Sequence, residues 1–211
     1  MGNIGSMNAT GYRTALLGVI VATASYAAVK PSVVAPGATL QRLCDGFSFT
    51  EGPAADAKGN VFFTDQPNDR ILKWSVDGKL SVFLSPCGRS NGLYFDRQGN
   101  LWACADLNNE LWRIEIDPND PNHVVTTVVV QSYGGRKLNG PNDAWIAPDG
   151  GIYLTDPYYK RNYWAPGPVE RVTGEHVYYL QPDGNDLLRV TSDLSKPNGI
   201  IGTPDGFYLY I

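Results

Sequence analysis

The sequence predicts an all-β fold, a β-propeller of which this chain holds about the first three to four blades. Three observations support this prediction. Residues that form turns and residues that favour strands are abundant, with 23 Gly, 15 Pro, 12 Tyr and 5 Trp among 211 residues. One phrase recurs four times at spacings typical of propeller blades. We also find no segment with the apolar periodicity of an amphipathic helix.

Each copy of the phrase begins with a polar residue, places a Gly turn eight positions later, and continues with a short apolar strand. The four polar residues are Glu51, Asn91, Asn142 and Asn198. The four turn glycines are Gly59, Gly99, Gly150 and Gly206. The polar positions are 40, 51 and 56 residues apart, which leaves room for two further strands in each unit.

The further strands follow in order along the chain. The first unit continues with residues 70–84, the second with 110–117 and 123–130, and the third with 175–194. An Asp-Gly turn separates two strands in the first and third of these stretches. A fourth unit begins at residue 197. A β-sandwich is the alternative fold, but it gives no reason for a polar residue to recur at one position of every unit.

The recurring polar residues predict a binding site. The innermost strand of each propeller blade lines a central channel, so residues at one repeat position are expected to converge on its axis. One carboxylate and three amides form a ring of oxygen atoms that suits Ca²⁺; Mg²⁺, Mn²⁺ and Zn²⁺ are the alternatives. Zinc is the least favoured, because His123 and His176 lie outside the repeated phrases.

A second interpretation of these residues is structural, because Asn-Gly is a turn signal by itself. Two details favour a metal site. The Pro-Asn-Asp sequence at residues 141–143 is not a standard hairpin turn. The first copy carries Glu51, and a turn has no need of a carboxylate there, whereas a cation needs a formal negative charge.

The same phrases resemble those of the gluconolactonase, senescence marker protein and luciferin-regenerating enzyme family, above all its bacterial gluconolactonase-like branch. The similar motifs are TEGPA…GNVFFTD, RSNGLYFDRQGNL, LNGPNDAW…DGGIYLTDPYY and KPNGIIGTPDG, which span residues 40 to 211. The resemblance implies a six-bladed propeller in which a central divalent ion, usually Ca²⁺, serves the hydrolysis of lactones.

The resemblance also implies the roles of individual residues. The implied metal ligands are Glu51, Asn142 and Asn198, and the implied substrate-binding residues are Asn91, Asp143, Asp156, Tyr158 and Tyr159. Asp143 could equally orient Asn142 or act as an additional ligand. In the family, the favoured general base is an Asp of the fifth blade, which would lie beyond Ile211. We therefore expect these 211 residues to be part of a longer protein.

The function implied is metal-dependent hydrolysis of a sugar lactone or a similar cyclic ester, with a small molecule as the partner. Three alternatives remain open. The propeller could be a non-catalytic binding module for carbohydrate or protein, it could be inactive without the fifth-blade Asp, or it could have a phosphotriesterase-like activity. A net charge of −4 and the lack of a basic run argue against nucleic acid as a partner.

The sequence near the N-terminus predicts that the protein is exported. Arg13 precedes an uncharged apolar run at residues 14–28 that contains a small-x-small sequence at 25–27, so residues 1–27 are interpreted as a secretory signal peptide. Cleavage would leave a periplasmic or extracellular domain at residues 28–211 without membrane attachment. A membrane anchor is the alternative, although the run is shorter than the roughly 20 residues of a span.

Three smaller features complete the predictions. Cys44, Cys87 and Cys104 are too few for a disulfide scaffold, and three buried thiols are preferred over one bridge. Asp65 and Asp106 are expected to bond to neighbouring backbone rather than to metal. The aromatic loop at residues 155–172 could cover the channel mouth and stack on a sugar ring, or could simply pack over neighbouring strands.

Overall fold

The structure, a computed structural model, describes residues 34–121, 123–164 and 166–211. The chain divides into two units, Met1–Arg42 and Leu43–Ile211. The described part of the first unit, residues 34–42, holds one turn and no strand. The predicted signal peptide at residues 1–27 lies outside the described residues. Within the described residues, no helix has the length and apolar character needed to cross a membrane.

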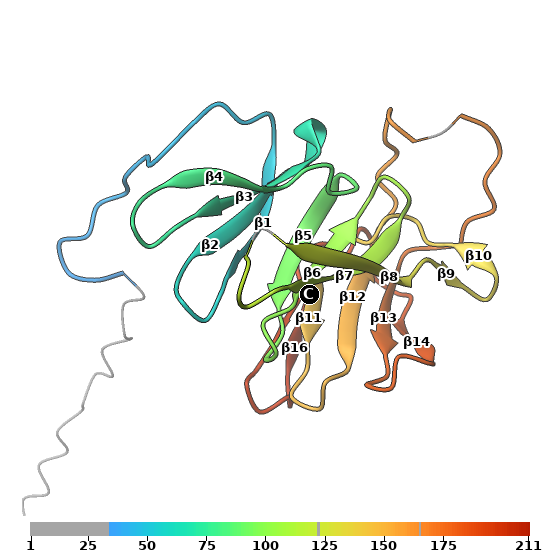
Figure 1. Cartoon of the computed structure of the whole chain (residues 1–211). Helices are drawn as coiled ribbons and strands as arrows, with labels where there is room; N and C mark the ends of the chain where they lie inside the picture. Colours follow the sequence, from blue (N-terminus) through green and yellow to red (C-terminus); the bar gives the residue numbers. More distant parts are fainter. Residues whose placement is uncertain (1–33, 122, 165) are drawn as a thin grey trace, which may run out of the picture. The chain divides into compact units, whose positions relative to one another are not determined.

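The second unit contains three four-stranded sheets, and in each of them every strand pairs antiparallel with the next strand along the chain (Figure 1). The first sheet consists of β1 (Thr50–Ala55), β2 (Val61–Asp65), β3 (Arg70–Trp74) and β4 (Leu80–Leu84). The second consists of β5 (Ser90–Phe95), β6 (Leu101–Ala105), β7 (Glu110–Ile116) and β8 (Val124–Val130). The third consists of β11 (Ala144–Ile146), β12 (Ile152–Asp156), β13 (His176–Leu180) and β14 (Leu187–Thr191).

Two short strand pairs and one helical turn are also present among the described residues. The strands β15 (Ile201–Gly202) and β16 (Leu209–Tyr210) form an antiparallel pair at the position of a fourth sheet. The strands β9 (Ser132–Tyr133) and β10 (Arg136–Lys137) form a small hairpin between the second and third sheets. A single turn of 3₁₀ helix, η1 (Gln66–Asn68), links β2 to β3. The predicted all-β architecture is confirmed.

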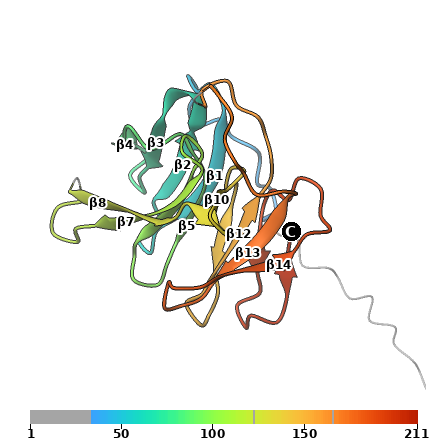
Figure 2. The same ribbon diagram turned by 90° about the vertical axis from the view of Figure 1, so that its right-hand side faces the viewer.

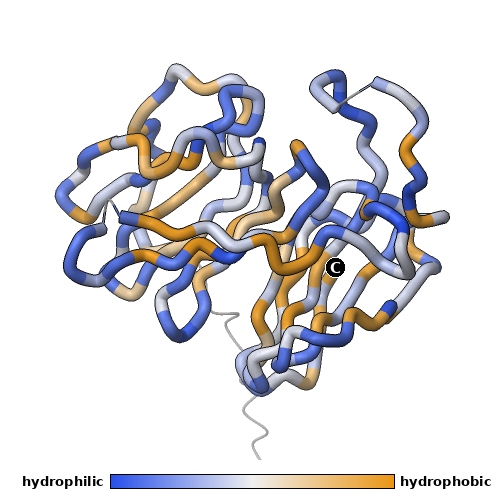
Figure 3. Tube along the Cα trace, turned by 45° about the vertical axis from the view of Figure 1, so that its right-hand side comes forward, coloured by the Kyte–Doolittle hydropathy of each residue, from blue (hydrophilic) through white to orange (hydrophobic). Residues whose placement is uncertain are grey.

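The four repeat glycines close the first hairpin of each sheet. Their φ angles are all positive, and those of Gly59, Gly99 and Gly150 are +86°, +86° and +91°. A residue with a Cβ atom adopts this conformation only at a cost, which explains why the position is glycine in every copy. Figure 3 shows hydrophilic segments at many of the turns and hydrophobic stretches along the chain between them.

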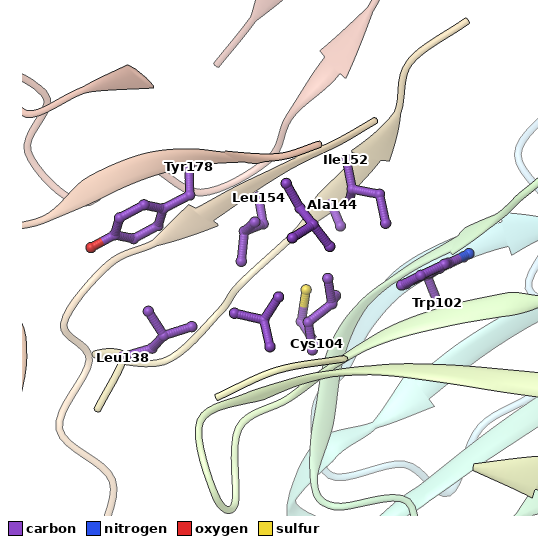
Figure 4. Packing of buried hydrophobic residues seen from close by; sticks show 10 residues of the cluster. Trp102, Cys104, Leu138, Ala144, Ile152, Leu154 and Tyr178 are labelled. Atoms are coloured by element: carbon purple, nitrogen blue, oxygen red, sulfur yellow. The ribbon is translucent and has the colours of Figure 1, made fainter. Parts of the chain in front are cut away.

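The sheets pack face to face, and their first strands are neighbours: β5 lies against β1 and β11, and β11 lies against β15. Apolar side chains fill the space between successive sheets. Trp102 and Cys104 of the second sheet point toward Ile152 and Leu154 of the third sheet (Figure 4), and Tyr178 of β13 belongs to the same cluster. Figure 2 shows the same sheets from the side. This arrangement brings the beginnings of the first strands together.

The three cysteines are free thiols. Cys87 and Cys104 are buried, whereas Cys44 is partly exposed, so two of the three predicted buried thiols are observed. Burial raises the pKa of Cys87 to about 12 and raises that of Cys104 well above its ordinary value. Both groups therefore stay protonated at neutral pH and pack as small apolar side chains.

Candidate functional site

The four recurring polar residues line one pocket of about 500 Å³, called the axial pocket below. Glu51 lies on β1 and Asn91 on β5, whereas Asn142 lies two residues before β11 and Asn198 three residues before β15. Successive sheets thus bring together residues that are 40 to 56 positions apart in the sequence. Asp143 lines the same pocket, as do Ile200, Tyr210 and Ile211, which the sequence did not single out.

Four polar side chains of this pocket, those of the recurring residues, form no hydrogen bond with a described residue. Asn91 and Asn142 are 3% and 5% exposed, yet neither amide group forms a hydrogen bond with a described residue. The carboxylate of Glu51 and the amide of Asn198 likewise form none. Buried amides are normally hydrogen-bonded. The donor set of this pocket therefore fits an external ligand that accepts carboxylate and amide oxygens, as a hard divalent cation does.

Close contacts between neighbouring backbones fix the spacing of these residues. A Cβ atom on Gly52 would collide with the carbonyl oxygen of Asn91, and one on Gly92 would lie 2.5 Å from the carbonyl oxygen of Asn142. The N–H of Gly92 donates to that same oxygen at 2.7 Å. Glycine directly after Glu51 and after Asn91 therefore lets the first strands of the first three sheets lie against one another.

Threonine hydroxyl groups hold the same backbones from the second strand. The Oγ1 of Thr64 donates to the carbonyl oxygens of Glu51 (3.1 Å) and Asn91 (2.9 Å), which belong to neighbouring sheets. The Oγ1 of Thr155 donates to the carbonyl oxygen of Asn198 at 2.6 Å. The corresponding position of the second sheet is Cys104, five residues after its turn glycine. The sequence contained this signal as Thr-Asp in two copies of the phrase.

Asp143 joins the third sheet to the fourth strand pair. Its Oδ2 accepts a hydrogen bond from the N–H of Ile200 at 3.0 Å, and its Oδ1 accepts one from the N–H of Ala144 at 3.0 Å. Its pKa is raised to about 6, chiefly by burial and to a smaller extent by the nearby charge of Glu51, whereas the two hydrogen bonds act to lower it. Two carboxylates thus face one pocket, and their repulsion favours binding of a cation there.

Asp156 lies outside the lining of the axial pocket. It is fully buried, and its carboxylate accepts hydrogen bonds from the N–H groups of Asn139 (3.0 Å) and Gly140 (2.8 Å). Asp65 binds the N–H groups of Ser48 and Phe49 in the same way, as expected. Both aspartates stabilise the segment that leads into a first strand. A backbone-binding role explains an aspartate at this position, and the substrate-binding role of Asp156 stays a prediction.

The hydrogen-bond partners of Asp106 differ from the predicted ones. Its carboxylate accepts hydrogen bonds from side chains, among them Arg161 and Tyr163, and none from backbone N–H groups. The structural reason is a shift of one residue. Asp65 and Asp156 follow their turn glycines by six positions, whereas Asp106 follows Gly99 by seven, so that Ala105 occupies the repeat position.

Tyr158 and Tyr159 lie outside the lining of the axial pocket. They begin the connection between β12 and β13, where the ring of Tyr158 packs on Trp164 with 5.9 Å between centroids. The ring of Tyr159 lies 5.0 Å from the Nζ of Lys196, which precedes Asn198 by two residues. The structure therefore places both tyrosines beside the segment that carries Asn198, rather than in the pocket.

The histidines are not part of this site. His176 is buried on β13, where its Nε2 lies 2.8 Å from the carbonyl oxygen of Thr173, and His123 lies near Asp117. Among the described residues, no group of three or more His, Cys, Asp or Glu side chains is close enough to hold a metal ion. A cation at the axial pocket would therefore depend on amide oxygens.

The sequence of this chain matches a known protein family. Residues 49–211 match the SMP-30/Gluconolactonase/LRE-like region. The chain belongs to the SMP-30/gluconolactonase/LRE-like family. The match covers every strand in the described part of this family member, and it includes the four polar residues that line the axial pocket.

Several relatives of this family member are gluconolactonases. A gluconolactonase from Zymomonas mobilis is 28% identical over 186 residues, which are 82% of this chain and 51% of the relative. The solved structure of a gluconolactonase from Xanthomonas campestris is 32% identical, with a TM-score of 0.70 over 80% of this chain and 55% of that one. The chain thus spans about half the length of these relatives.

A more distant relative shares the fold alone. Regucalcin from Agrobacterium tumefaciens, a calcium-binding protein, is 18% identical, with a TM-score of 0.57 over 80% of this chain and 52% of that one. The three complete sheets and the fourth strand pair thus correspond to about half of a propeller-fold structure.

Proposed function

We propose that the protein hydrolyses a sugar lactone or a similar cyclic ester with the help of a divalent cation, preferably Ca²⁺, in the axial pocket. One observation carries this proposal: a carboxylate and three amides from successive sheets face one pocket and have no partners among the described residues. Family membership supports it, because relatives about 30% identical to this chain are gluconolactonases.

The residues of the pocket have distinct parts in this proposal. Glu51 supplies the formal negative charge that a cation needs, and the amide oxygens of Asn142 and Asn198 supply neutral ligands. When bound, the cation would polarise the lactone carbonyl and stabilise the negative charge on its oxygen. The amide N–H of Asn91 can donate a hydrogen bond to a substrate oxygen. Asp143 binds Ile200 and so keeps the segment with Asn198 in place.

The test is the substitution Glu51→Gln, which removes the charge and keeps the size of the side chain. In the parent protein, Ca²⁺ is expected to raise the melting temperature, because a ligand that binds only the native state stabilises it. The variant should lose most of this rise, and lactone hydrolysis should fall by about 100-fold or more. Thermal melts with and without Ca²⁺, and a pH-indicator assay with D-glucono-δ-lactone, measure the two effects.

The matched control is Glu115→Gln, since Glu115 is a partly exposed residue of β7 that pairs with Arg113 at 3.1 Å. Exposed pairs contribute little to stability, so this variant should behave as the parent does. Unchanged Ca²⁺ binding in Glu51→Gln would contradict the ligand assignment. Loss of Ca²⁺ binding in the variant, together with a parent that hydrolyses no lactone, would instead indicate a metal-dependent binding module.

A further inference from the structure

A recurring hydrogen-bond pattern stabilises the lead-in segments, by which we mean the two or three residues before each polar residue of the axial pocket. In the first and third sheets, an aspartate at the end of the second strand binds the lead-in N–H groups of its own sheet. Asp65 binds Phe49, and Asp156 binds Gly140. Phe49 and Gly140 each precede the polar residue of the pocket by two positions.

The second sheet uses a different carboxylate for the same purpose. Asp69, at the end of η1 in the first sheet, accepts hydrogen bonds from the N–H groups of Cys87 (3.0 Å) and Arg89 (2.6 Å). Arg89 precedes Asn91 by two positions. Asp106 is therefore not needed by its own lead-in segment, although it is only 2% exposed. The buried carboxylate of Asp106 can therefore form hydrogen bonds with other parts of the chain.

Asp106 holds the beginning of the connection between β12 and β13, which is the long orange loop of Figure 1. Its Oδ2 accepts hydrogen bonds from the Nε of Arg161 (2.7 Å) and the hydroxyl of Tyr163 (2.6 Å). Its backbone carbonyl accepts one from the Nε1 of Trp164 at 2.7 Å. Three side chains from residues 161–164 thus form hydrogen bonds with one residue of the second sheet.

Glu175 fixes the same segment at its other end. One carboxylate oxygen accepts a hydrogen bond from the N–H of Tyr158, and the other accepts one from the N–H of Lys196, both at 2.8 Å. Lys196 precedes Asn198 by two positions, so Glu175 joins the segment to the lead-in of the fourth strand pair. Residues 157–164, called the rim segment below, are therefore anchored to two sheets.

The rim segment touches three successive lead-in segments at the same repeat position. The ring of Tyr163 lies 4.5 Å from the guanidinium of Arg89, and that of Tyr159 lies 5.0 Å from the Nζ of Lys196. Between them, Trp164 approaches Gly140 so closely that a Cβ there would lie 3.4 Å from its ring. The segment thus runs beside the end of the axial pocket at which the polar residues begin.

We propose that the rim segment is a fixed recognition wall for the substrate ring, and that Asp106 is the residue that positions it. Tyr158 is 43% exposed, although its ring packs on Trp164. A rigid aromatic ring offers an apolar face and a hydroxyl group, which suit the C–H face and the hydroxyls of a sugar ring. The wall therefore selects hydroxylated six-membered rings over unsubstituted ones. This inference rests on the proposed function.

The test compares two variants with a matched control. Asp106→Asn removes the charge that Arg161 binds, and Tyr163→Phe removes one hydroxyl and keeps the ring on Arg89. The control is Tyr179→Phe, which removes a hydroxyl that donates to Asp149 at 2.8 Å, at the turn that joins β11 to β12. Should Asp106→Asn fail to fold, Tyr163→Phe still decides the question.

Two measurements follow each variant. Trypsin cleavage after Lys160 and Arg161, identified by mass spectrometry, should become about tenfold faster when the rim segment loses its anchor. Binding is measured by NMR titration with glucono-δ-lactam and δ-valerolactam, which share one ring and resist hydrolysis. Affinity for glucono-δ-lactam should fall about fivefold, with that for δ-valerolactam unchanged, because only the hydroxylated ring contacts the wall.

The outcomes separate this inference from the proposed function. Unchanged cleavage in both variants would show that Asp106 does not position the segment. Faster cleavage with an unchanged affinity ratio would show that the segment is structural only. Neither result depends on turnover, so a parent protein without lactonase activity would overturn the proposed function and leave these binding measurements decisive. The control should match the parent in both measurements.

Discussion

At the residue scale, the glycines after Glu51 and Asn91 decide how closely two sheets approach. Gly92 lies between Asn91 and the third sheet, where a Cβ atom would meet the carboxylate of Asp143 and the backbone of Asn142. Backbone atoms cannot rotate away as a flexible side chain can, so the two sheets themselves would have to move. The identity of this residue therefore controls the distance between two of the proposed ligand-bearing segments.

The corresponding prediction concerns Gly92→Ala. We expect it to lower the free energy of unfolding by about 3 kcal/mol, because the added methyl group forces the first strands apart. The stabilisation by Ca²⁺ should decrease as well, since Asn91 and Asn142 separate. The control is Gly99→Ala. A Cβ atom at this position would have no neighbouring atom within 4 Å, but the φ angle is +86°. This substitution should therefore lower the free energy of unfolding by about 1 kcal/mol through backbone strain alone. If urea denaturation shows that both variants lose the same free energy of unfolding, this explanation is contradicted.

At the element scale, the second strand of a sheet fixes the first strand of the next sheet. Thr155 on β12 donates to Asn198 of the fourth strand pair, and its Oγ1 also accepts a hydrogen bond from the N–H of Asp143 at 3.1 Å. The second sheet has Cys104 in this place, and there the N–H of Gly92 binds Asn142 instead. Each junction thus has at least one hydrogen bond to the backbone of a pocket residue.

The prediction at this scale is Thr155→Val, which keeps the shape of the side chain and removes its hydroxyl. The loss leaves the carbonyl oxygen of Asn198 and the N–H of Asp143 without this partner, at a cost of about 1–3 kcal/mol. Thr126→Val on β8 is the control, since Thr126 is exposed, and it should change stability by less than about 0.5 kcal/mol. Calorimetric melts of both variants measure the difference. If Thr155→Val is as stable as the parent, packing alone holds the third sheet against the fourth strand pair.

The elements show why sequence reasoning found part of this site and missed the rest. The polar residues and turn glycines recur at a fixed spacing, and repetition is visible without coordinates. The contacts of Asp106 have no such period, because Arg161 and Tyr163 reach it from another sheet. A shift of one residue, which left Ala105 at the repeat position, was enough to change the role of this aspartate.

At the scale of the whole molecule, buried carboxylates link stability to pH. The pKa of Asp156 is raised to about 6, chiefly by burial and to a smaller extent by the charge of Asp106, whereas hydrogen bonds from Asn139 and Gly140 and the charge of Arg171 act to lower it. Asp149 shows the opposite shift, because hydrogen bonds from Gly151 and Tyr179 lower its pKa. The two residues lie at opposite ends of the third sheet and should respond to pH in opposite directions.

The sign for Asp156 follows from proton uptake. Between pH 4 and pH 6 the native state holds this proton more tightly than the unfolded state, whose pKa is about 3.8. The free energy of unfolding should therefore fall as the pH rises through this window, by up to about 3 kcal/mol for this group. In Asp156→Asn the fall should be smaller. Urea titrations at pH 4, 5, 6 and 7 in calcium-free buffer measure it.

Asp149→Asn provides the opposite case. The lowered pKa of Asp149 contributes stability that is present at neutral pH and is lost as the pH falls through its native pKa, so the variant should reduce the loss of stability on acidification. Asp143, whose pKa is also raised to about 6, keeps a residual slope in Asp156→Asn. If Asp156→Asn and the parent give parallel curves between pH 4 and pH 6, burial does not hold the proton on Asp156.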